Sequence, residues 1–206
     1  MRSQINNLRY TDPNSVAIGL RAKTGRAIVV VVGGTRDAPA ILYKSEIKLF
    51  DPRIPATFQP YHEVMDLPWD ESERAVQKFV RAIRKVTTKA VAQLVSQQSA
   101  KGVNVRAVAT VGAKDRDLTR IGNSHIRAHA AEGVLFRRVL DEAAVANGLP
   151  VQVFAEREFE QTIKQRLGSK STSVRKRLDE AARALRPPWR ADEKLAAMAA
   201  WLVLHR

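Results

Sequence analysis

Three strand-like segments occur in succession in the first 50 residues, and this constrains the fold more than any other feature. Val16, Ile18 and Leu20 alternate with other residues, as in a strand that buries one face. Residues 27–32 are an alanine, an isoleucine and four valines, a run typical of a buried strand. A third apolar segment covers 41–50. The chain is therefore predicted to open as a three-stranded meander.

The remainder of the chain alternates between helical patterns and single strands. The expected elements are, in order, a helix at 70–98, a strand at 103–111, a helix from Asn123 or Ser124 to 147, a strand at 151–155, and helices at 157–167, 172–186 and 191–204. The order βββαβαβα predicts an α/β fold with a mixed five-stranded sheet and helices on both faces. We divide the chain into an N-terminal arm, residues 1–14, and a single domain, residues 15–206.

The charge of the chain limits its partners. Its 206 residues include 35 Lys and Arg against 21 Asp and Glu, a net charge of +14, which favours a polyanion such as nucleic acid. The absence of cysteine excludes disulfides, zinc–thiolate sites and thiol catalysis. No apolar run approaches the roughly 20 residues of a membrane span, and the N-terminal residues lack the apolar stretch of a signal peptide. We therefore expect a cytoplasmic protein that has no membrane partner.

Half of the net positive charge lies between Thr162 and Arg190, a stretch that contains nine basic residues and only two acidic ones. The loop 168–173 adds hydroxyl groups and backbone donors that can bind phosphate oxygens. A solvated basic face is the alternative explanation, but the clustering favours contact with a sugar–phosphate backbone. The residues predicted to bind nucleic acid are Arg21, Lys23, Lys164, Arg166, Lys170, Arg175, Lys176, Arg186 and Arg190.

Three stretches after residue 120 carry a family resemblance. They are Ala131-Glu132-Gly133 in the second predicted helix, the segment from Gly148 to Lys164 around the fifth strand, and the alanine-rich helix from Ala191 to His205. Together with the order of elements, they resemble the RuvC branch, the Holliday-junction resolvases, of the ribonuclease-H-like superfamily. The resemblance implies a ribonuclease-H-like fold and DNA as the favoured partner. Because the family is dimeric, the resemblance is also compatible with a homodimer of this chain.

The acidic residues that such a nuclease needs are mostly missing. Enzymes of this type use carboxylates to hold two divalent cations about 4 Å apart. Arg21 stands where the first strand would carry its acid, and the end of the fourth strand, residues 109–111, contains no carboxylate. Asp192 and Glu193 remain at the last helix, with Glu193 in the register of the family, but adjacent helical residues point about 100° apart. We therefore expect a nucleic-acid-binding protein that is inactive or impaired as a nuclease and holds no metal or other cofactor.

Two alternatives stay open. In the first, the chain is an active, structure-selective endonuclease that binds Mg²⁺ through relocated carboxylates: Glu193, Asp192 and one of Asp115, Asp117 or Glu132. Asp115 and Asp117 are otherwise explained as part of a charged loop whose signs cancel. In the second, the chain is a scaffold for a protein partner and self-associates through the second predicted helix.

Two further acidic or histidine patterns have simpler explanations. His125, His129 and Glu132 share one face of the second predicted helix and could bind a metal ion. Because a histidine pair of this kind is common by chance, we interpret the two imidazoles as solvent-facing and assign no metal ligand. Glu156 follows the fifth strand, where α/β folds often build sites, but an acid in a first helical turn already suits the helix dipole.

Overall fold

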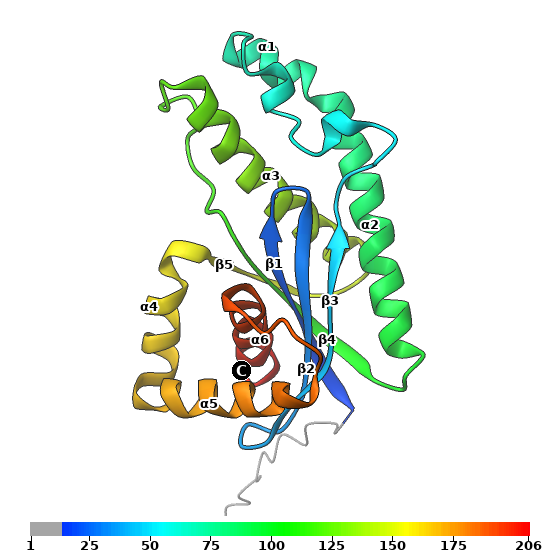
Figure 1. Cartoon of the computed structure of the whole chain (residues 1–206), viewed down its shortest axis with the longest axis vertical. Coiled ribbons are helices and arrows are strands. Elements are labelled where there is room, and N and C mark those ends of the chain that lie inside the picture. The colour runs from blue at the N-terminus through cyan, green and yellow to red at the C-terminus, as the bar shows by residue number, and fades with distance from the viewer. Residues whose placement is uncertain (1–13) are drawn as a thin grey trace, which may run out of the picture.

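The β-branched run and its two neighbouring segments form one antiparallel meander, to which two parallel strands are added (Figure 1). The computed structural model describes residues 14–206, so the predicted N-terminal arm lies outside the described residues except for Asn14. The strands are β1 (Ser15–Lys23), β2 (Arg26–Gly34), β3 (Pro39–Lys48), β4 (Asn104–Gly112) and β5 (Val151–Ala155). The α-helices are α1 (Trp69–Ala75), α2 (Gln77–Ser99), α3 (Ser124–Ala146), α4 (Glu156–Leu167), α5 (Ser171–Ala181) and α6 (Ala191–Leu204). Four short 3-10 helices complete them: η1 (Pro55–Thr57), η2 (His62–Val64), η3 (Gly168–Lys170) and η4 (Ala182–Ala184).

The sheet has the strand order β3-β2-β1-β4-β5. β2 runs antiparallel to both β1 and β3, whereas β4 runs parallel to both β1 and β5. A meander is thus followed by two parallel strands, each reached through a crossover that contains helices, as the order of elements predicted. The predicted fold class, a mixed five-stranded sheet with helices on both faces, is confirmed.

One predicted helix is divided in two, and another ends earlier than expected. The helix expected at 70–98 is divided at Val76, whose fully buried side chain packs into the core where α1 meets α2. The helix expected at 172–186 ends as α5 at Ala181 and continues only as the short η4. Leu185, two residues before Pro187, already has an extended backbone.

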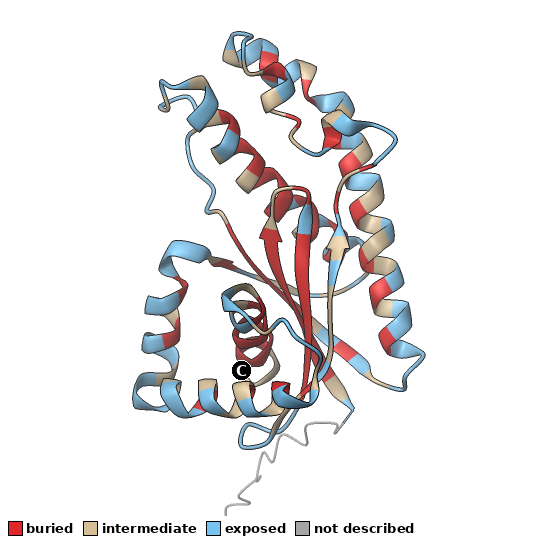
Figure 2. Ribbon diagram, in the orientation of Figure 1, coloured by how far each residue is buried: buried red, intermediate tan, exposed pale blue. Residues whose placement is uncertain are grey.

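The sheet separates two hydrophobic cores. Val16, Ile18 and Leu20 of β1 point to the side of α2 and α3, whereas Ala17 points to the side of α4, α5 and α6. Figure 2 shows the consequence, since the central strands and α6 are buried along most of their length. Arg21, four residues after Ala17, is also on the α6 side, which places a charged side chain at the edge of a core.

Helix α6 approaches β1 so closely that no side chain fits between them. A Cβ atom added to Gly19 would lie 1.9 Å from the carbonyl oxygen of Ala196, a backbone atom that cannot swing away. Glycine at this position therefore fixes the depth at which α6 lies on the sheet. It also fixes the position of the first turn of α6, which carries Asp192.

We predict that Gly19→Ala destabilises the protein by about 3 kcal/mol or more, because overpacking against backbone cannot be relieved by a rotamer change. Gly122→Ala is the matched control, since a Cβ atom there would meet nothing within 4 Å. Urea denaturation followed by circular dichroism measures both free energies of unfolding. Equal stabilities of the two variants would contradict the close approach of α6.

Candidate functional site

The carboxyl edge of the three parallel strands gathers charged side chains from distant parts of the chain. β1, β4 and β5 all end at this edge, where Arg21 pairs in register with Val111. Glu156 follows β5 directly, and Asp192 lies in the first turn of α6. In α/β folds this edge is where functional sites are often built.

Arg21 connects the acidic residues at this edge. Its side chain is only 5% exposed, and its Nη2 atom forms an ion pair with Oε1 of Glu156. Its Nε atom lies 3.3 Å from Oδ1 of Asp192. Its Nη1 atom donates to the carbonyl oxygen of Ala22 at 2.8 Å and to that of Val111 at 3.5 Å. The guanidinium thus bridges carboxylates from two separate helices and is bonded to the ends of two strands.

The arrangement disfavours a divalent cation at this point. A two-metal site needs several carboxylate oxygens directed at a shared position that holds no other positive group. Here the guanidinium of Arg21 lies between Glu156 and Asp192, and Nζ of Lys23 lies 3.3 Å from the second oxygen of Asp192. Because Arg21 is buried and has internal partners, its charge is compensated within the protein rather than presented to solvent.

The carboxylates considered as relocated metal ligands do not converge with Asp192. Glu193 is 7% exposed, and its Oε2 atom accepts a hydrogen bond from the backbone N–H of Arg190, so it caps its own helix. Asp115 forms ion pairs with Arg137 and Arg138. The structure therefore brings Asp192, and not Glu193, to Arg21. Asp117 accepts hydrogen bonds from Thr119 within its own loop.

A second polar network lies between β4 and α3. The hydroxyl of Thr110 donates to Asp141 at 2.5 Å, and Nη1 of Arg137 donates to the other oxygen of Asp141 at 2.7 Å. Burial raises the pKa of Asp141, whereas its hydrogen bonds with Thr110 and Arg137 act in the opposite direction.

An open hollow of about 520 Å³, lined in part by Asp115 and Arg137, adjoins this network. Sequence reasoning missed Asp141, although its spacing of four from Arg137 on one helix is a recognisable signal.

The predicted nucleic-acid-binding residues of the basic stretch lie on α4, η3, α5 and the linker before α6. Figure 1 shows α4 and α5 meeting in a corner at η3, with α6 beside them. Arg175 is paired with Glu160 at 2.7 Å, and Lys176 lies 4.0 Å from Glu180. The guanidinium of Arg166 stacks over the ring of Phe154, 5.3 Å from its centre.

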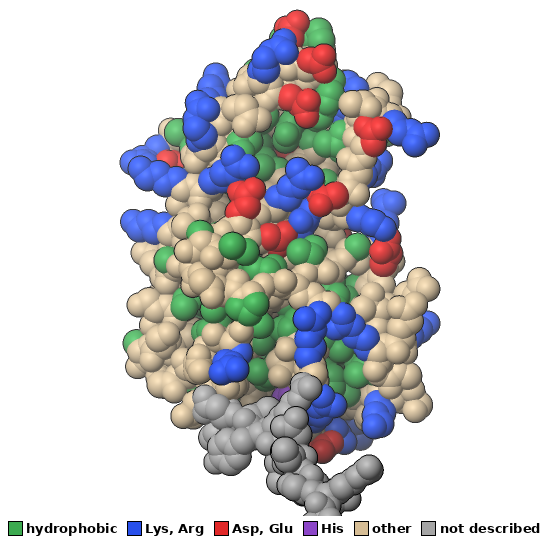
Figure 3. All heavy atoms as spheres, turned by 180° about the vertical axis from the view of Figure 1, so that it is seen from behind, with side chains coloured by type: hydrophobic (Ala, Val, Ile, Leu, Met, Phe, Trp, Pro, Cys, Tyr) green, Lys and Arg blue, Asp and Glu red, His purple; other side chains and the backbone are tan. Residues whose placement is uncertain are grey.

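Several of these residues keep their charge available to solvent. Lys164, Lys170, Arg186 and Arg190 are exposed, and within residues 14–206 none of their side chains has an acidic partner. On the face opposite to that of Figure 1, basic side chains are instead scattered among acidic and hydrophobic ones (Figure 3). Within the basic stretch, Arg166 and Arg183 are also exposed and have no acidic partner among residues 14–206.

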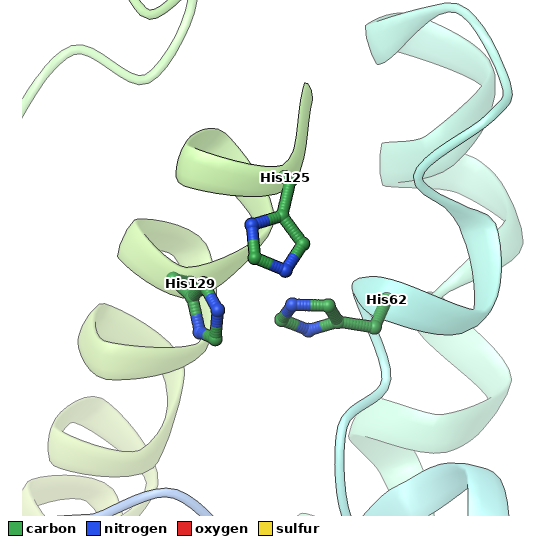
Figure 4. A group of neighbouring side chains, drawn as sticks. All are labelled: His62, His125 and His129. Carbon is green, nitrogen blue, oxygen red and sulfur yellow. The ribbon is translucent and has the colours of Figure 1, made fainter. Parts of the chain in front are cut away.

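The histidine row on α3 is only partly as predicted. His125 and His129 are exposed, but Glu132 is fully buried and is bonded to Nδ1 of His62 at 2.8 Å. His62 belongs to η2, in the proline-rich segment between β3 and α1, where no periodic pattern indicated its position. The three imidazole rings face one another (Figure 4).

No protein-family model matches this chain, and no curated protein sequence matches it. Several solved structures are similar to it. RuvC of Thermus thermophilus, in complex with a Holliday junction substrate, is 15% identical, with 91% of this chain and 90% of that chain covered and a TM-score of 0.48. The yeast mitochondrial Holliday junction resolvase Ydc2 is 10% identical, with 94% and 83% covered and a TM-score of 0.41. A Ppx/GppA family protein of Aquifex aeolicus is 11% identical, with 68% and 34% covered and a TM-score of 0.31.

At these identities the similarities concern the fold alone. The similar structures include RuvC and a Holliday junction resolvase, the branch that the sequence resembles, and every TM-score is below 0.5.

We predict that Arg21→Met lowers the free energy of unfolding by about 1–3 kcal/mol, because Glu156 and Asp192 lose their shared counter-charge while staying partly exposed to water. Lys114→Met is the matched control. It removes an ion pair with Glu158 in which both side chains are more than half exposed, and should cost below about 1 kcal/mol. Urea denaturation at neutral pH measures both, and a loss no larger for Arg21→Met than for the control would argue against the bridge.

Proposed function

We propose that this chain binds nucleic acid, with DNA the favoured form, and that it does so without two-metal nuclease activity. The observation that carries the proposal is a cluster of exposed basic side chains of the stretch 162–190 that have no acidic partner among residues 14–206, including Lys164, Lys170, Arg186 and Arg190. Such side chains contact phosphate groups, which position a nucleic acid without reading its sequence.

The distribution of charge supports this proposal. The chain carries a net charge of +14, and the stretch from Thr162 to Arg190 supplies half of it. Arg175, Arg177 and Lys176 of this stretch are compensated by acidic neighbours, so the available charge lies at the α4–α5 corner and in the linker before α6. Contacts to phosphate release counterions, and the binding should therefore depend strongly on salt.

The bridge of Arg21 between Glu156 and Asp192 supports the absence of two-metal catalysis. A guanidinium at this point repels the cations that would activate water and stabilise the leaving oxygen. The alternative, an Mg²⁺-dependent endonuclease that uses Glu193, Asp192 and Asp115, lacks an observation in its favour, since these three acids have different partners.

We predict binding of duplex, single-stranded and four-way-junction DNA with a Kd of roughly 10⁻⁴ to 10⁻⁶ M at physiological salt. Fluorescence anisotropy with labelled DNA over a salt series measures the affinity. The four-way junction is included because the Thermus thermophilus RuvC structure contains a Holliday junction substrate. Absence of binding at low salt to all three forms would overturn the proposal.

We predict that the double variant Lys164→Ala, Lys170→Ala weakens duplex binding on the order of tenfold and reduces the slope of log Kd against log salt by about 1.8. Arg81→Ala, Lys89→Ala is the matched control, because it removes the same charge from exposed positions of α2. Equal losses in both double variants would mean that the α4–α5 corner is not the binding surface.

We predict no cleavage of a four-way junction or duplex by the wild-type protein in the presence of Mg²⁺ or Mn²⁺. A gel assay with labelled strands measures this. Cleavage that is abolished by Glu193→Gln would instead establish the endonuclease alternative with its original ligand assignment.

The remaining expectations from the sequence stay predictions. These are a cytoplasmic location, self-association as a homodimer and the alternative role as a protein-interaction scaffold. None of the helices in residues 14–206 is both long and apolar enough to cross a bilayer. Size-exclusion chromatography with light scattering distinguishes a monomer from a dimer.

A further inference from the structure

Three of the four histidines of the chain meet at one place, although they come from two distant segments. His62 belongs to η2, and His125 and His129 lie one turn apart at the start of α3. One ring nitrogen of each lies within 4.8 Å of those of the other two. Figure 4 shows the three rings directed toward a common space between η2 and α3.

Glu132 holds the central histidine of this cluster in place. It lies one turn beyond His129 and is fully buried, and its Oε1 atom bonds Nδ1 of His62 at 2.8 Å and accepts from the backbone N–H of His62 at 3.3 Å. Because a carboxylate only accepts hydrogen bonds, Nδ1 of His62 carries the proton and Nε2 is left with its lone pair in the neutral ring. Nε2 is buried and has no hydrogen-bond partner among the residues that the structure describes.

This pair is electrostatically incomplete by itself. A fully buried carboxylate is costly unless it is paired and its oxygens are satisfied, yet Oε2 of Glu132 has no partner within the described chain. Histidines that bind a metal ion typically donate their other ring N–H to a carboxylate, which orients the ring and strengthens it as a ligand. An ion at Nε2 of His62 would use its free lone pair and bring positive charge toward Glu132.

We propose that His62, His125 and His129 bind a divalent transition-metal ion, Zn²⁺ being the best fit, with Glu132 as the residue that positions His62. Three imidazoles without carboxylate or thiolate ligands suit Zn²⁺, whereas Mg²⁺ and Ca²⁺ take oxygen ligands. Three histidines leave a fourth tetrahedral position, which a water molecule or an anionic ligand fills.

The geometry needs only a small adjustment of side chains. Zinc–nitrogen bonds of about 2.0–2.1 Å place tetrahedral ligand atoms about 3.4 Å apart, compared with up to 4.8 Å here. His125 and His129 are exposed and can change rotamer, whereas His62 is only 15% exposed and is held by Glu132. A bound ion would connect η2 to α3, on the side of the sheet opposite α6 and separate from the basic residues of α4 and α5.

The test is isothermal titration of the metal-free, untagged full-length protein with Zn²⁺ in the presence of a competing chelator, together with thermal unfolding. We expect one Zn²⁺ per chain and a rise in Tm on Zn²⁺ addition. His125→Asn and His129→Ala, both at exposed positions, should weaken binding at least tenfold and remove the rise in Tm. Glu132→Gln should weaken binding 10- to 100-fold if circular dichroism shows an unchanged fold.

His205→Gln is the matched control, because it removes the one histidine outside the cluster, which packs against Trp201. It should leave the Zn²⁺ stoichiometry and affinity unchanged. The proposal is overturned if the wild-type protein binds no Zn²⁺, or if His125→Asn and His129→Ala bind it as tightly as the wild type. In either case the cluster is a buried His62–Glu132 pair beside two solvated imidazoles. The result does not depend on whether the chain binds nucleic acid.

Discussion

The contact between α6 and β1 determines what the carboxyl edge of the sheet can do. Because Gly19 lets the backbone of α6 lie directly on β1, the first turn of that helix arrives beside the end of the strand. Arg21 lies two residues after Gly19 on β1 and points to the same face of the sheet. Asp192 is thereby held within 3.3 Å of the Arg21 guanidinium. The end of β1 thereby becomes the centre of an internal ion-pair network.

Positive charge in this chain is therefore of two kinds. At the sheet edge, Arg21 and Lys23 are matched by Glu156 and Asp192, and their charge contributes to the arrangement of the fold. At the corner of α4 and α5, lysines and arginines outnumber the acids around them and face water. Only the second kind produces a field that reaches a polyanion in solution, because compensated pairs largely cancel beyond a Debye length.

The periodic segments of the sequence predicted the strands and the helices on both faces of the sheet. They did not predict that Glu156 would be the partner of Arg21, since periodicity assigns a residue to a face but not to a neighbour on a distant element. His62 was missed because the proline-rich segment around it has no period. The sequence placed Glu132 on one helical face with His125 and His129, but it did not predict that Glu132 would be buried against η2.

The strand order also has a consequence for contacts between copies of the chain. β3 and β5 form the two borders of the sheet, where unpaired backbone groups could recruit a strand from another molecule. β3 begins at Pro39 and carries Lys44, Glu46 and Lys48 along its second half, features that discourage such pairing. β5 is only five residues long. Extension of the sheet into a fibre is thus disfavoured at both borders, which leaves helical surfaces as the place for any specific self-association.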